Sequence, residues 1–435
     1  MTEAPMQAIG TQGTRSSSLV RLLTATELDT RMLGMIGALA AIWIALHFFS
    51  GGLFLTPRNL WNLSVQSSPV TIMATGMVLV IVTRNIDLSV GSMLGFLGMI
   101  MGVVQADLLP KLLGFDHPAT WIVSLAIGLI IGVLIGALQG FIIAYLGVPS
   151  FIVTLGGLLV WRGGAWWATS GQTIAPLDQR FRLMGGGPEG AIGATWSWVV
   201  AIAGCGAVIA LLVHGRARRK AFAFALRPIA ADVFLGGVTC ALIVVAVAIA
   251  NAYPWPAGSV RRYVELKHIA LPGGGLFIAH GIAVPVLIAI GVGLVMTFLA
   301  TRTRFGRYVY AIGGNPEAAV LAGVNTRWVI MKIFILMGLL AGIAGAISIA
   351  RLNAATNSEG SLAELLVIAA AVIGGTSLAG GVGTVAGAML GAVLMQSLQS
   401  GMVLLGVDTP VQNIVVGAVL VIAVGLDTLY RRRAG

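Results

Sequence analysis

Long apolar runs constrain this chain more strongly than any other feature of its sequence. Its 435 residues are 58% hydrophobic and only 9% charged, whereas soluble domains contain about 25% charged residues. No water-soluble core could bury so much apolar surface, so the chain is predicted to cross a membrane several times. The predicted fold class is all-α, a polytopic helical membrane protein.

Twelve apolar segments come close to the roughly 20 residues that a spanning helix needs. The second and the tenth of them are notably short. The predicted spans cover residues 34–49, 70–83, 88–104, 121–145, 150–167, 196–213, 232–250, 281–300, 329–349, 362–372, 385–402 and 411–426.

The basic residues predict how these spans are oriented. When the N-terminus is placed in the cytoplasm, most of the 26 lysines and arginines fall in cytoplasmic segments, as the positive-inside rule requires. We therefore predict a cytoplasmic tail over 1–33, a transmembrane domain over 34–427 and a cytoplasmic tail over 428–435. The net charge of +11 is assigned to these loops, and no nucleic-acid partner is predicted.

Two similar glycine-containing hexamers indicate an internal repeat. VGSMLG at 90–95 matches VGTVAG at 382–387, and each follows a short apolar run and a turn. Paired, glycine-interrupted segments in the two halves of a membrane protein point to a transport pathway.

The stretch RNIDLSVGS at 84–92 places an acid between two apolar runs. An ionised group there is expensive, so Asp87 is expected to be functional or paired, with Arg84 as a local partner. One interpretation is that this loop lines the pathway or shapes its inner gate. The other is that Asp87 only caps the helix that follows.

A short, complete helix signal lies in the segment 301–328, which the orientation places in the cytoplasm. Asn315 suits the N-cap, Pro316 the first helical position and Glu317 the positive end of the helix dipole. Gly323 suits the C-terminal stop. A two-turn helix is unstable alone in water, so it must pack either on this chain or in a groove of a cytoplasmic partner.

Several chemical motifs are missing from the sequence. None of the four lysines follows a glycine, so there is no Walker A site. The five histidines show no metal-ligand spacing, and no G-x-S-x-G elbow is present. We therefore predict no catalytic residue, no metal site and no cofactor bound by this chain.

Several motifs that are present in the sequence resemble those of bacterial ABC importer permeases. GNPEAAVLAGV is similar to their EAA signature, although the Leu-Pro pair that often closes it is absent. Three further stretches resemble the ribose, xylose and galactose branch of monosaccharide permeases. They are IDLSVGS, VPSFIVTLGGLLVWRG with the following SGQTI, and IGGTSLAGGVGTVAG. The extra pair of spans at 196–250, with its basic loop, is similar to an insertion in xylose permeases.

The resemblance implies a monosaccharide permease subunit in the bacterial inner membrane, with xylose as the preferred sugar. Its implied partners are a second permease copy, a periplasmic sugar-binding protein and a cytoplasmic ABC ATPase that binds ATP and magnesium. The residues assigned to ATPase coupling are Gly306, Gly313, Asn315, Pro316, Glu317, Ala318, Ala319 and Gly323. Those assigned to the translocation pathway are Asn85, Asp87, Ser89, Gly91, Ser92, Thr154, Gln396 and Gln399.

Other functions stay open at this stage. A twelve-span secondary transporter would need intramembrane acids, for which Asp87 and Glu364 are the candidates, and a collapsed proton gradient would abolish its uptake. A membrane scaffold or receptor would accumulate no solute in vesicles. Within the ABC class, ribose, galactose, an autoinducer sugar and branched-chain amino acids are rival cargoes.

Overall fold

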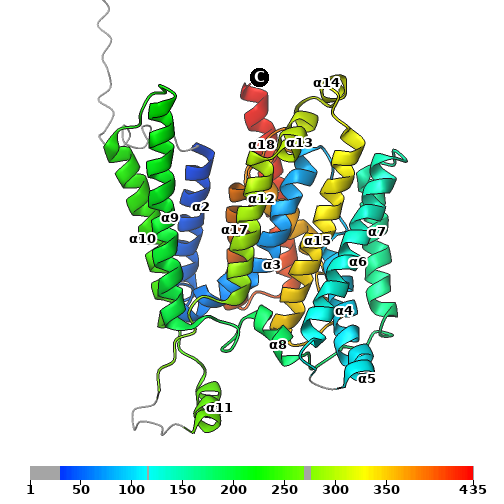
Figure 1. The fold of residues 1–435 in the computed structure, drawn as a ribbon, viewed down its shortest axis with the longest axis vertical. Coiled ribbons are helices and arrows are strands. Elements are labelled where there is room, and N and C mark those ends of the chain that lie inside the picture. The colour runs from blue at the N-terminus through cyan, green and yellow to red at the C-terminus, as the bar shows by residue number, and fades with distance from the viewer. Residues whose placement is uncertain (1–29, 115–116, 269–275, 435) are drawn as a thin grey trace, which may run out of the picture. The chain divides into compact units, whose positions relative to one another are not determined.

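The computed structural model describes residues 30–114, 117–268 and 276–434, most of which are helical (Figure 1). The predicted tail over 1–33 lies almost wholly outside the described residues. The chain forms two compact units, and the helix pair Val199–Ala246 belongs to the first. The second unit contains Arg31–Trp198 and Val247–Gly435.

The helix pair in the first unit is formed by most of α9 (Gly193–Ala221) and α10 (Ile229–Ala252). Arg216 Nη1 lies 2.7 Å from Asp232 Oδ2, which joins the two helices by an ion pair. Cys205 and Cys240 are both free, and each thiol faces the other residue's carbonyl oxygen at 3.9 and 4.0 Å. Both cysteines therefore contribute to the packing of one helix against the other.

Each of the twelve predicted spans coincides with a helix, and nine helices among the described residues are long and apolar enough to cross a membrane. The predicted polytopic helical fold is therefore confirmed. Besides α9 and α10, the helices at these positions are α2 (Thr30–Phe49), α3 (Pro57–Val82), α4 (Val90–Val103), α6 (Thr120–Ala144), α7 (Ser150–Trp167), α12 (Val284–Arg302), α15 (Thr326–Leu352), α16 (Ala363–Ile373), α17 (Val385–Leu404) and α18 (Thr409–Ala434).

Shorter elements complete the second unit. A π-helical turn (Val104–Leu108) and α5 (Leu109–Leu113) extend α4, while α8 (Gln179–Arg182), a 3-10 turn (Leu183–Gly185) and α11 (Ala257–Lys267) lie in connections. Figure 1 shows α18 ending at the same end of the bundle as α13 (Arg304–Gly314) and α14 (Pro316–Leu321), with α5, α8 and α11 at the opposite end.

The second span is much longer than predicted. α3 has 26 residues and continues through Pro69, whereas the sequence predicted a start at residue 70. Thr56 caps its N-terminus by accepting a hydrogen bond from the Asn59 amide at 3.4 Å. The hydroxyls of Ser67 and Ser68 donate to the carbonyl of Ser64 at 3.0 and 2.9 Å. These polar residues resemble a loop in sequence, but they belong to a helix, and Ser67 and Ser68 are both buried inside the protein.

Glycines allow α6 and α15 to pack backbone against backbone. A methyl group added at Gly132 would lie 2.5 Å from the carbonyl oxygen of Gly338, and one at Gly140 would lie 2.9 Å from the Met331 Cα. Small residues at such interfaces replace the hydrophobic driving force that lipid does not provide. α15 also packs against α3 and α4, so it forms the centre of the bundle.

Candidate functional site

The short helix predicted from its start and stop signals is present as α14. Asn315 Oδ1 accepts a hydrogen bond from the Ala318 amide at 3.0 Å, and Pro316 occupies the first helical position. Gly323 has φ +79°, and the Val324 amide donates to the carbonyl of Ala319 at 3.0 Å. This pattern is the glycine-dependent C-terminal stop, so both ends of α14 are fixed by local interactions.

One side of α14 faces the protein and the other faces outward. Ala319 is only 4% exposed, whereas Val320 and Leu321 are 56% and 89% exposed. Ala319 was assigned to ATPase coupling, but its side chain packs inside this chain. Helical side chains three or four residues apart share a face, so the face of α14 that contains Ala319 is turned toward the protein. The surface open to a partner instead contains Leu321, Val320 and the exposed Glu317 and Ala318.

The helix α13 precedes α14 and was not predicted. Thr303 caps it, and its hydroxyl accepts a hydrogen bond from the Gly306 amide at 3.2 Å. Phe305, Val309 and Ile312 point toward the protein at helical spacing, and Val309 and Ile312 are buried. This i, i+4, i+7 pattern and the capping threonine were the available signals, but the intervening arginines and glycines resemble a loop.

α13 is attached to two connections that are far apart in sequence. Arg84 donates from Nε to the carbonyl of Gly313 at 3.1 Å and from Nη2 to that of Gly314 at 3.0 Å. Tyr310 donates its hydroxyl to the carbonyl of Gly383 at 2.8 Å. The connection before α4 and the connection before α17 are therefore both bonded to α13.

Close backbone contact at Gly313 strengthens this attachment. A methyl group at Gly313 would overlap the carbonyl oxygen of Val82 and would lie 2.6 Å from the Gly381 amide nitrogen. Gly381 also donates its amide to the carbonyl of Val82 at 3.0 Å. At Gly306, a methyl group would overlap the carbonyls that end α12. Gly306 and Gly313, two of the three glycines assigned to coupling, thus hold α13 against the bundle.

Asp87 does not pair with Arg84, which is occupied at α13. Instead, Asp87 Oδ1 accepts hydrogen bonds from the Ser89 amide at 2.8 Å and the Ser89 hydroxyl at 2.6 Å. Ser89 is the N-cap of α4, so Asp87 holds the turn that leads into this helix and makes no bond to the helix's first turn. Burial raises the pKa of the Asp87 carboxyl above its usual value of 3.8, against the hydrogen bonds from Ser89, which lower it.

Two further helices contribute side chains to the Asp87 site. Gln139 on α6 donates its amide to the Ser89 hydroxyl at 2.9 Å. Thr154 on α7 donates its hydroxyl to the carbonyls of Ser150 at 2.8 Å and Ile86 at 3.2 Å. Gln139 was not predicted, although it is the polar side chain within an otherwise apolar part of the 121–145 run.

The other residues assigned to the pathway are divided between this site and distant positions. Gly91 is buried beside Ser89, and the hydroxyl of Ser92 donates to the Ser89 carbonyl at 2.8 Å. The side-chain amide of Asn85 donates a hydrogen bond to the carbonyl of Thr83 at 3.0 Å. Gln396 and Gln399 lie on α17, which packs chiefly against α3 and α16, and no hydrogen bond among the described residues joins them to Asp87.

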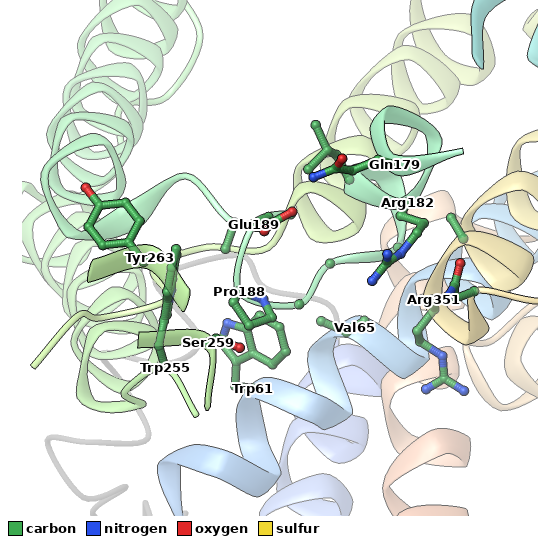
Figure 2. A pocket seen from close by; sticks show the side chains of 18 of the residues that line it. Trp61, Val65, Gln179, Arg182, Pro188, Glu189, Trp255, Ser259, Tyr263 and Arg351 are labelled. Carbon is green, nitrogen blue, oxygen red and sulfur yellow. The ribbon is translucent and has the colours of Figure 1, made fainter. Parts of the chain in front are cut away.

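A pocket of about 740 Å³ lies at the end of the bundle opposite α14. Figure 2 shows Trp61, Trp255 and Tyr263 on one side of it, with Arg182 and Arg351 on the other. Aromatic faces and arginine donors together suit a polar ligand that also has apolar surface. The sequence did not predict this pocket, because its walls come from four segments that only the fold brings together.

The fold and these sites define a multi-pass helical membrane protein. A family profile described as "Branched-chain amino acid transport system / permease component" matches residues 59–424. The chain therefore belongs to this family, which confirms the resemblance noted from its motifs. No solved structure matches the chain.

Three curated relatives cover most of the chain. The xylose transport system permease protein XylH of Escherichia coli strain K12 is 38% identical over 94% of this chain and 94% of its own length. The protein of the same name from Haemophilus influenzae is 37% identical over 91% of this chain and 96% of its own length. The ribose import permease protein RbsC of Escherichia coli K12 is 32% identical, covering 86% and 87%.

Proposed function

We propose that this chain is the permease subunit of an ABC importer that carries xylose inward across the bacterial inner membrane. Higher identity to the two xylose permeases than to the ribose permease supports xylose as the cargo. The inserted helix pair at 196–250 supports the same choice. Ribose and galactose are the alternative sugars, and membership of a transport permease family disfavours a receptor or scaffold.

The observation that carries this proposal is the exposed, doubly capped helix α14. Its outward face includes Leu321 at 89% exposure, and an apolar side chain so exposed at a bundle end suits a partner's groove. In this proposal, the partner is a cytoplasmic ATPase that binds ATP and magnesium, because this chain has no Walker A motif. The segment 301–328 is then the coupling segment.

The contacts of α13 suggest how movement of α14 reaches the pathway. A single residue, Asn315, separates the end of α13 from the start of α14. It is bonded through Arg84 to the connection that contains Asp87, and through Tyr310 to the connection before α17. We propose that the ATPase moves α13 and α14 together and that these bonds move both connections.

The proposed orientation places the α13–α14 end in the cytoplasm, together with both termini. Arg302, Arg304, Arg307 and Arg327 cluster around these two helices, as the positive-inside rule would require. The 740 Å³ pocket at the other end would then face the periplasm, where a sugar-binding protein would dock. A homodimer of permeases completes the proposed complex.

The test is uptake by the reconstituted complex in proteoliposomes. The permease is combined with an ABC ATPase and a sugar-binding protein from the same organism, and labelled xylose, ribose and galactose are supplied with ATP inside. We expect ATP-dependent uptake of xylose that survives collapse of the proton gradient. Uptake of ribose or galactose in place of xylose would identify that sugar as the cargo. Uptake that needs the proton gradient but not ATP would overturn the ABC assignment.

A further inference from the structure

The connection from α15 to α16 crosses part of the bundle without forming a helix. α15 has 27 residues and is about 40 Å long at 1.5 Å per residue, enough to span the membrane. α16 has 11 residues, so its length of about 16 Å covers only half of a hydrocarbon core of roughly 30 Å. The irregular residues 353–362, here called the unwound segment, must cover the other half.

A glycine face of α4 makes room for the unwound segment. Gly91, Gly95, Gly98 and Gly102 lie on one side of this helix at i, i+4, i+7 and i+11. A methyl group at Gly102 would lie 2.7 Å from the Ala355 Cβ, and one at Gly91 would lie 2.5 Å from the Gly360 carbonyl oxygen. The segment therefore runs along α4 from near its C-terminal end to its first turn, beside the Asp87 site.

Specific hydrogen bonds hold this segment in place. Arg162 on α7 donates from Nη1 to the carbonyls of Asn357 and Glu359, both at 2.9 Å. The carboxylate of Glu359 accepts a hydrogen bond from the Ser348 hydroxyl on α15. Ala355 exchanges two backbone hydrogen bonds with Ile174, at 3.0 and 2.9 Å. These hydrogen bonds fix the conformation of the segment within the bundle.

The side of the segment that faces away from α4 is exposed and polar. Ser358, Ser361 and Leu362 are exposed, and the Ser361 hydroxyl donates to the Ser358 carbonyl at 2.6 Å. Leu362 has φ +61°, a left-handed conformation that is strained for a non-glycine residue, and such residues cluster at functional sites. Irregular polar backbone at membrane depth cannot face lipid and is found only where protein or water covers it.

We propose that residues 356–362 line a water-filled pathway for the sugar, with the hydroxyls of Ser358 and Ser361 facing the solute. This inference rests on the proposed function, and a second copy of the chain forms the facing wall. A serine hydroxyl has one proton to donate and two lone pairs that accept. The Ser361 proton is already donated to the Ser358 carbonyl, so Ser361 can accept hydrogen bonds from a passing polyol, and the Ser358 hydroxyl can donate or accept, without binding it tightly. Neither serine was among the residues predicted from the sequence.

The test is the reactivity of single cysteines with a charged, water-soluble methanethiosulfonate. Ser358→Cys and Ser361→Cys are made in a permease without Cys205 and Cys240, and labelled in proteoliposomes with reagent on both sides. Lys111→Cys, at an exposed position of α5, is the water-facing control. Leu134→Cys, at an exposed mid-helix position of α6, is the lipid-facing control.

We expect Ser358→Cys and Ser361→Cys to react at rates close to that of Lys111→Cys. Leu134→Cys should react about a hundredfold more slowly, because apolar surroundings suppress the thiolate that attacks the reagent. Labelling at Ser358→Cys or Ser361→Cys should also block sugar uptake, and xylose at high concentration should slow the labelling.

Slow labelling of both serine variants, as slow as that of Leu134→Cys, would overturn the inference, because a dry interface would then cover the segment. Labelling that leaves uptake unchanged would overturn it as well. Failure of the proposed function has a different signature: the unmodified complex would transport no sugar with ATP, whatever the labelling pattern.

Discussion

Leu321 offers the sharpest test of the partner surface on α14. Burying a leucine side chain contributes about 1.5–3 kcal/mol, and Leu321 is 89% exposed in this chain. If a partner covers it, Leu321→Ala should remove about 2 kcal/mol of binding free energy, which is roughly a thirtyfold loss of affinity. The permease itself should change in stability by less than about 0.5 kcal/mol, as is usual for an exposed site.

The measurement is the affinity of the purified ATPase for the permease in nanodiscs, together with binding-protein-stimulated ATP hydrolysis. Ala319→Leu is the matched control on the same helix, since Ala319 is 4% exposed. Added bulk there should destabilise the permease by about 1–3 kcal/mol. The two variants therefore separate a loss of partner contact from a loss of internal packing.

Unchanged ATPase affinity in Leu321→Ala, with normal sugar-coupled turnover, would refute the reasoning. α14 would then be a connector that packs on its own chain, and the proposed function would lose its main structural support.

Three further predictions concern the bundle. Gly136→Leu should lower thermal stability in detergent by about 1–3 kcal/mol or more, because a side chain there overlaps the backbone of α15, while Gly156→Leu, with open space at its Cβ, should not. Burial lowers the pKa of His280 below 6.5, so the unfolded state binds the proton more readily and stability should fall as the pH drops below about 6.5. That slope should be absent in His280→Gln. Asp87→Asn keeps an oxygen for the Ser89 amide, so we expect normal protein levels with slower uptake, and a wild-type rate would remove its pathway role.

Local signals in the sequence were sufficient for α14. Its cap, its proline and its terminal glycine act within a few residues, so the helix could be predicted with its boundaries. The apolar runs also predicted the positions and order of the apolar helices, because burial in lipid is decided by composition over about 20 residues, but nine of the described helices, and not twelve, are long and apolar enough to cross a membrane.

Features set by tertiary contacts were missed. The first half of α3 contains serines that satisfy their hydroxyls on the preceding turn, so a buried helix has the composition of a loop. Arg84 appeared to be a partner for Asp87 because they are three residues apart, yet its guanidinium reaches Gly313, 229 residues away. The 740 Å³ pocket and the contribution of Gln139 depend on segments that only folding brings together.

The double attachment of α13 has a consequence for transport stoichiometry. Because Gly313 touches both Val82 and Gly381, one displacement of α13 changes the connections before α4 and before α17 at the same time. If these connections control the proposed pathway, neither of them can move without the other. In the proposed importer, every completed ATPase cycle should then move both connections together, so the ratio of ATP hydrolysed to sugar moved should stay constant as the sugar concentration varies.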